Sequence, residues 1–130
     1  MTWMIVIADN DEATRMVLGH ALERSGYAVE TIADGQCLWP TLQLPEVSLV
    51  ILDLRMPGMN GWEVLRRLKD TRQHPAMARP ALPVIVISGQ SDPETQRFAV
   101  RLGAAAFMAK PIDLQDLGRT VRKVLRAEAV

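Results

Sequence analysis

The chain has 130 residues, the length of one domain and enough to enclose a hydrophobic core. Its 15 Lys and Arg residues balance 15 Asp and Glu residues, so no net positive field attracts nucleic acid or an anionic membrane. No apolar run approaches the roughly 20 residues of a membrane span, and the start lacks the basic segment of a signal peptide. The single cysteine, Cys37, cannot form an internal disulfide, so we expect a small buried side chain and a reducing, cytoplasmic location.

Short apolar runs predict the strands. Residues 3–8, 47–52, 83–88 and 105–109 are almost continuously apolar, which is typical of parallel strands covered on both faces. The segment 27–32 mixes polar and apolar residues and predicts an edge strand.

Helical periodicity fills the intervals between these runs. It predicts helices over 12–25, 61–72 and 93–102 and from Leu114 onward. The pattern over 35–43 is weaker because Pro40 interrupts it, and further prolines predict a loop over 71–83. The residues expected on the core-facing stripes are Ala13, Val17, Leu18, Ala21, Leu22, Gly61, Val64, Leu65, Leu68, Thr95, Phe98, Ala99, Leu102, Leu114, Leu117, Val121, Val124 and Leu125.

Capping residues stand where these helices are expected to begin. Asp11, Asp92 and Asp113 each precede a helical pattern, and Asn60 with Glu63 has the spacing of a capping box. Strands that alternate with helices in this way predict βαβ units, hence an open parallel sheet with helices on both faces in a single domain spanning 1–130.

Polar side chains follow four of the predicted strands. In such a sheet ligands bind beyond the carboxyl ends of the strands, so these residues should converge there: Asp9, Asn10, Asp11, Asp53, Ser88 and Lys110. Crowded carboxylates repel each other and favour a divalent cation such as Mg²⁺, while a lysine and a hydroxyl suit phosphoryl oxygens. Asp53 is then a candidate nucleophile that forms an aspartyl phosphate.

The residues after Asp53 predict a sharp turn. Met56-Pro57-Gly58 would direct the carbonyl just beyond Asp53 toward the metal. Pro57 fixes φ, and Gly58 and Gly61 allow conformations that larger residues resist.

Three motifs, in order and at matching spacing, carry a resemblance that covers essentially the whole chain. They are "DLRMPGMNG" at 53–61, "ISG" at 87–89 and "GAAAFMAKP" at 103–111. With them the chain resembles the receiver domains of two-component response regulators, in particular chemotaxis-regulator-like receivers. The resemblance implies a doubly wound, flavodoxin-like three-layer α/β fold with five strands in the order 2-1-3-4-5 and five helices.

The resemblance also implies a role for each site residue. Asp53 would accept a phosphoryl group from a sensor histidine kinase or a phosphotransfer protein, and Ser88 and Lys110 would hold that group. Mg²⁺ would lie among Asp9, Asn10, Asp53 and the main-chain carbonyl of Arg55. Phe107 would be the aromatic switch that turns inward when Ser88 moves, and the Lys110–Pro111 bond would be cis. Arg55 and Gln90 occupy positions that modulate autodephosphorylation.

These roles imply a signalling switch whose only catalysis is its own phosphorylation and dephosphorylation. The surface that phosphorylation reshapes would bind a downstream effector protein, or a second copy of the chain to form a homodimer. No DNA-binding element follows the last helix, so we expect no direct contact with nucleic acid or membrane. An effector domain outside this sequence stays an open alternative.

Asn10 departs from the family pattern. The second position of the acidic pair normally supplies a direct carboxylate ligand to Mg²⁺, and the asparagine keeps an oxygen without the charge. At an effective dielectric constant of about 20, that loss is on the order of a few kcal/mol, and compensation by Asp11 stays open.

Two alternatives follow from the same residues. The first is a receiver-fold binding module that acts with weak or no phosphorylation because of Asn10. The second is a flavodoxin-type cofactor binder or small enzyme, although no G-x-G-x-x-G follows the first predicted strand.

Overall fold

The computed structural model describes residues 3–56, 58–72, 82–90 and 92–129. Five strands form one sheet: β1 (Met4–Ala8), β2 (Ala28–Ile32), β3 (Val47–Asp53), β6 (Val84–Ser88) and β7 (Ala106–Ala109). The helices are α1 (Glu12–Arg24), α2 (Leu38–Leu42) after the 3₁₀ turn η1 (Gly35–Cys37), α3 (Gly61–Arg72), α4 (Pro93–Arg101) and α5 (Leu114–Ala129). Two further strands of two residues, β4 (Arg55–Met56) and β5 (Met59–Asn60), form a separate antiparallel pair.

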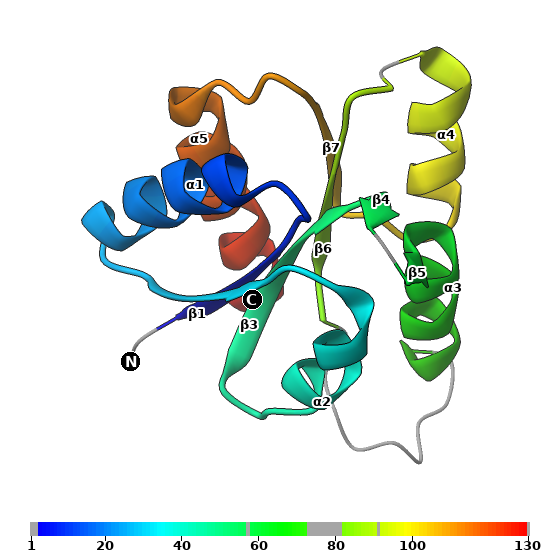
Figure 1. The fold of residues 1–130 in the computed structure, drawn as a ribbon, viewed down its shortest axis with the longest axis horizontal. Coiled ribbons are helices and arrows are strands. Elements are labelled where there is room, and N and C mark those ends of the chain that lie inside the picture. The colour runs from blue at the N-terminus through cyan, green and yellow to red at the C-terminus, as the bar shows by residue number, and fades with distance from the viewer. Residues whose placement is uncertain (1–2, 57, 73–81, 91, 130) are drawn as a thin grey trace.

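The sheet is parallel and has the order β2-β1-β3-β6-β7. This confirms the predicted order 2-1-3-4-5, since β6 and β7 are its fourth and fifth strands. Figure 1 shows α1 and α5 on one face and α2, α3 and α4 on the other. The predicted three-layer, doubly wound fold is therefore correct.

Alternate residues of the central strands serve two separate cores. On β1, Ile5 and Ile7 pack with α1 and α5, whereas Val6 and Ala8 pack with the helices of the opposite face. Side chains of a strand point alternately to its two faces, so burial on both explains the continuous apolar runs. The exception is β7, an edge strand whose residues are partly exposed although its run is equally apolar.

Most predicted caps form. The Asp11 and Asp92 side chains accept the backbone N–H groups of Thr14 and Thr95, and Asp113 accepts those of Gln115 and Asp116. One half of the predicted capping box forms, since the Asn60 side chain accepts the Trp62 N–H. The other half is wrong, because Glu63 forms an ion pair with Arg67 (3.6 Å). The pattern over 35–43 resolves into η1 and α2, two short turns instead of one helix.

Several expected core positions are exposed instead. Ala13 lies on the surface, and Val17, Phe98 and Leu114 are 52%, 45% and 42% exposed. The buried face of these helices is narrower than the face that the periodicity predicts. Phe98 makes an edge-on contact with Trp62, with 4.9 Å between the ring centres.

Other expectations have mixed outcomes. Cys37 is exposed, so the prediction of a buried side chain is wrong, because η1 turns it outward. Pro57 and residues 73–81 of the predicted loop lie outside the described residues. In the part of the chain that the structure describes, no helix is both long and apolar enough to span a membrane.

We expect Asp92→Ala to destabilise α4, mainly through loss of the cap. Hydrogen bonds from the Thr95 side chain and backbone lower the pKa of Asp92, so its folded pKa lies below that of the unfolded chain. This contribution to stability is therefore present above pH 3.8 and is lost as pH falls through the folded pKa.

The unfolding temperature of Asp92→Ala should lie below that of the native protein at pH 7, with the difference closing under acid. Gln96→Ala, an exposed change on the same helix, is the matched control. A difference between Asp92→Ala and the native protein that is the same at pH 7 and pH 2.5 would contradict the assignment.

Candidate functional site

Three charged side chains meet at the carboxyl edge of the sheet. The Lys110 Nζ lies 2.9 Å from Asp9 Oδ2 and 3.0 Å from Asp53 Oδ2. They come from the ends of β1, β3 and β7, which are far apart in sequence. The parallel order of the sheet brings them together, as expected for ligands beyond strand ends.

Asp9 is fixed by its neighbours and fully buried. Its Oδ1 accepts the Asp11 N–H at 2.9 Å, and its main-chain carbonyl accepts Arg15 Nη1 at 2.8 Å. Among the described residues its Oδ2 has no hydrogen bond of good geometry, and the Lys110 ammonium is its one ionic contact. The Asp9 Oδ2 thus faces one cation already, the Lys110 ammonium.

Asp53 is 3% exposed, and the turn that follows it positions its carboxylate. The Arg55 N–H donates to Asp53 Oδ1 at 3.0 Å, while Oδ2 faces Lys110. The chain then folds back as the β4–β5 hairpin, with Gly58 at a φ of +71°. Gly61 serves by close approach instead of an unusual φ: a Cβ there would lie 2.7 Å from Leu54 Cα.

Burial and charge act on these groups in opposite directions. Desolvation raises the pKa of Asp9, with the nearby Asp53 charge adding to the rise, and this outweighs the lowering effects of the Asp11 N–H and the Lys110 ammonium. Burial disfavours the Lys110 charge, but the contacts with the Asp9 and Asp53 carboxylates outweigh burial and raise the pKa of that lysine. The ammonium is therefore held in its charged form between two carboxylates.

Ser88 and Asn10 lie at the same edge of the sheet but outside this cluster, whereas Phe107 lies within β7. Ser88 ends β6 and is buried, and its hydroxyl accepts the Gln90 N–H at 3.0 Å. Asn10 is exposed and lines a hollow with Leu54, Arg55, Met56, Met59 and Asn60. Phe107 pairs with Val86 in the sheet and packs, partly buried, against the core on the α3 side. The Lys110–Pro111 bond is cis, as predicted.

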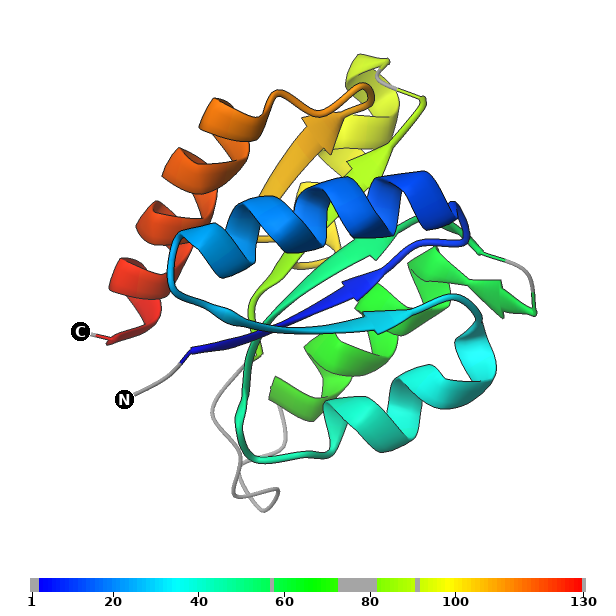
Figure 2. The same ribbon diagram turned by 60° about the vertical axis from the view of Figure 1, so that its left-hand side comes forward.

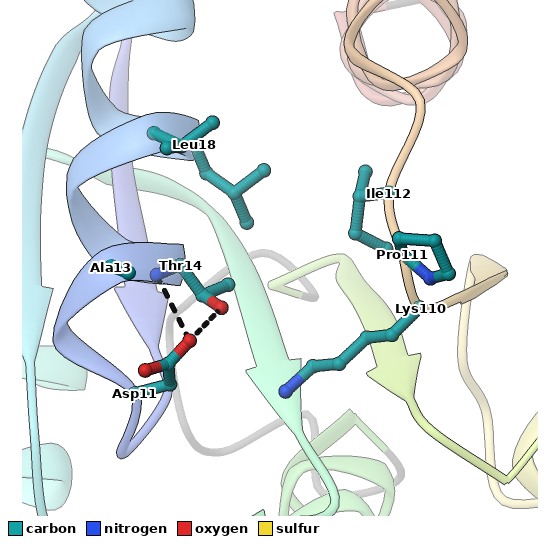
Figure 3. Close-up of a pocket in the computed structure, with 8 residues that line it drawn as sticks. Asp11, Ala13, Thr14, Leu18, Lys110, Pro111 and Ile112 are labelled. Atoms are coloured by element: carbon teal, nitrogen blue, oxygen red, sulfur yellow. Dashed lines mark hydrogen bonds between the residues drawn. The ribbon is translucent and has the colours of Figure 1, made fainter.

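A second hollow lies behind Lys110, between α1 and the segment that leads into α5 (Figure 3). Its volume is about 510 Å³, and Val17, Leu18, Pro111 and Ile112 form its apolar walls. Asp11, held by two hydrogen bonds to Thr14, lies at the end of the hollow that Lys110 also lines (Figure 3). Asp11 thus acts as the helix cap.

The donor set suits a hard cation. Asp9 and Asp53 supply two buried carboxylates at this edge of the sheet, and Asn10 and Arg55, one and two residues further along the chain, line one hollow together. Mg²⁺ favours one or two carboxylates completed by neutral oxygens and water. In the described ranges no group of three His, Cys, Asp or Glu side chains is arranged to hold a metal.

Two structural features of the site escape sequence reasoning. The Arg15 contact to the Asp9 carbonyl bridges six residues, and no local pattern signals it. The β4–β5 hairpin is equally hidden, because two-residue strands carry no periodicity. Both features hold the loops that carry the charged residues.

Comparison with known proteins identifies the class. Residues 5–122 match the response regulator receiver domain family. The chain is 38% identical over 121 residues to the DNA-binding transcriptional regulator NtrC of Bradyrhizobium sp. (strain RP501 Parasponia), covering 93% of this chain and 24% of that regulator. The chain thus spans about a quarter of that relative's length.

Solved structures agree. A CheY-like receiver domain protein of Methanospirillum hungatei JF-1 superposes with a TM-score of 0.84 at 26% identity, covering 99% of this chain and 98% of that one. The BeF₃-activated receiver domain of DrrB, a Thermotoga maritima protein, gives 0.83 at 25% identity over 97% and 99%. The fold and site thus define a two-component signalling module of the CheY-like type. The chain belongs to the response regulator receiver domain family, whose members are generally signalling modules and typically depend on Mg²⁺.

Proposed function

We propose that this chain is a phosphorylation-controlled switch in which Asp53 accepts a phosphoryl group from a histidine kinase or a phosphotransfer protein. The observation that carries the proposal is the placement of one ammonium within 3.0 Å of both Asp9 and Asp53. A buried carboxylate beside a fixed cation is suited to become an acyl phosphate, because the cation stabilises the charge that the phosphoryl group brings. A cytoplasmic location goes with a kinase partner of this kind.

The transfer exchanges one bond for another. An oxygen of Asp53 attacks phosphorus, and as the new O–P bond forms the P–N bond of phosphohistidine breaks, returning its electron pair to the imidazole. Lys110 stays in place and exchanges its contact with Asp53 for one with a phosphoryl oxygen. Mg²⁺, held by Asp9, Asp53, the Arg55 carbonyl and Asn10, would neutralise charge on the transferring oxygens.

The strands next to the site, β6 and β7, would carry the effect of phosphorylation to a protein-binding surface. Ser88 at the end of β6 would hold another phosphoryl oxygen, and its movement would leave room for Phe107 on β7. The face formed by α4, β7 and α5 would then favour an effector protein or a second copy, which is a shift between two populations. The position of Phe107, partly buried and paired with Val86 of β6, supports this role.

The test uses acetyl phosphate, which transfers its phosphoryl group to the Asp53 carboxylate and releases acetate. We expect the intact mass to rise by one phosphoryl group with Mg²⁺ and much less with EDTA. Asp53→Ala is the negative control, and Glu46→Ala, an exposed acid before the start of β3, is the matched control that should still be phosphorylated. No gain in mass with Mg²⁺, or an equal gain in Asp53→Ala, would contradict the proposal.

Asn10 supports a second candidate, a binding module that works with weak or no phosphorylation. The fold does not depend on this exposed side chain, whereas the charge of the metal site does. A Mg²⁺ titration of the native protein, followed by NMR, separates the two. Tight binding would remove the reason for this candidate.

A further inference from the structure

The β4–β5 hairpin rests on a glycine from another part of the chain. A Cβ placed on Gly35 would lie 2.3 Å from Met59 Cβ, 2.9 Å from its Sδ and 3.1 Å from its Cγ. Rotation of the methionine cannot relieve the first contact, because a Cβ is fixed to its own backbone. Any side chain at residue 35 therefore forces the turn at residue 35 and β5 apart.

A displacement of β5 reaches the site through hydrogen-bonded pairs. Met59 pairs with Met56 and Asn60 pairs with Arg55, so the two short strands shift together. Arg55 donates its N–H to Asp53 Oδ1 at 3.0 Å. Its carbonyl is the main-chain oxygen assigned above to Mg²⁺.

The segment that carries Gly35 also holds the opposite side of the site. The Ile32 carbonyl, at the end of β2, accepts the Asp9 N–H at 3.1 Å. Two residues further on, Asp34 accepts the Gln36 N–H at 2.9 Å and fixes the turn at Gly35. In Figure 2 the turn after β2 lies beside the β4–β5 hairpin. One short segment thus contacts both the Asp9 strand and the hairpin.

We propose that Gly35 is a positioning residue for the metal site: its missing side chain lets the hairpin approach closely enough for the Arg55 carbonyl and Asp9 to share one cation. The inference rests on the proposed function and adds the element that sets the spacing of the ligands. Partners behind metal ligands typically change affinity by about 10- to 100-fold when they are altered. We expect a weakening of Mg²⁺ binding of about tenfold for Gly35→Ala.

The experiment is a Mg²⁺ titration without phosphodonor, read from the amide NMR signals of Arg55 and Asn60. It is made in the Asn10→Asp background, where the acid restores the usual charge. Gly35→Ala should raise the Kd, and adding Met59→Gly should restore it because the clashing Cβ is removed. Met59→Ala keeps that Cβ and should not restore it. Leu42→Ala, in the α2 core, should lower the unfolding temperature and leave the Kd unchanged.

An unchanged Kd in Gly35→Ala, or equal effects of Met59→Gly and Met59→Ala on it, would overturn the inference. Absence of Mg²⁺ binding in the Asn10→Asp background would overturn it as well. The proposed function is judged separately, by the phosphoryl mass gain of the native chain. A native chain that gains the phosphoryl group while the Kd values stay equal removes only the role of Gly35.

Discussion

Lys110→Met is expected to reduce phosphorylation of Asp53 by about 100- to 1,000-fold, the usual effect of removing one charge-stabilising group. The same change leaves two buried carboxylates facing each other without their shared cation. Breaking a buried ion pair costs about 3–5 kcal/mol, and because Lys110 is 27% exposed we expect a loss of about 2–3 kcal/mol in unfolding free energy at pH 7.

The stability loss in Lys110→Met has a predicted pH dependence. The pKa of Asp9 is already raised by burial and should rise further without the ammonium. A folded pKa above that of the unfolded chain means that folding favours the protonated acid, so the loss should shrink as pH falls through it. Urea unfolding at pH 7 and pH 5 measures this, with Lys123→Met on the exposed side of α5 as the matched control. Equal stability of the two variants at pH 7 would contradict the ionic cluster.

Asn10→Asp is expected to tighten Mg²⁺ binding by at least tenfold. One added negative charge beside a divalent cation is worth on the order of a few kcal/mol at an effective dielectric constant of about 20, and 1.4 kcal/mol is a factor of ten. The carboxylate would add a third acid to Asp9 and Asp53 at this edge of the sheet. Phosphorylation by acetyl phosphate at limiting Mg²⁺ should accelerate in parallel.

Asn60→Asp is the matched control for that change. It adds the same charge to the same hollow, from β5, and an aspartate there can still cap Trp62. A clearly smaller effect of Asn60→Asp on the Kd indicates ligation at residue 10. Equal effects of the two variants would mean that a general increase in negative charge, and not a ligand, is responsible.

The apolar runs predicted the layers and the parallel sheet well, because burial on both faces leaves long apolar runs, whereas the strand order was predicted by the family resemblance. The predictions were wrong where contacts between individual side chains determine which residues are buried. Phe98 has the helical spacing of a core residue, yet its side chain is largely exposed. It lies at the border of the buried face of α4, where the ring packs against the neighbouring ring of Trp62. Cys37 is exposed because it ends η1, in which Gly35 is the buried residue, and α2 begins only at Leu38.

The site was predictable in part for a similar reason. Strand ends are recognisable, so the meeting of Asp9, Asp53 and Lys110 follows from topology alone. The Arg15 and Gly35 contacts depend on how closely neighbouring loops pack against each other. No spacing of residues in the sequence indicates that distance. The roles of Ser88 and Phe107 depend on movement between two states, so they stay predictions.

The most direct measurement locates the phosphoryl group after reaction with acetyl phosphate and Mg²⁺. Borohydride reduces an aspartyl phosphate to homoserine, which peptide mass spectrometry then places in the sequence. Homoserine at residue 53 and at no other acid is the result expected here. Homoserine at Asp9 or Asp11, or none in a protein that binds Mg²⁺, would contradict the claim that the lysine-paired carboxylate at the end of β3 is the acceptor.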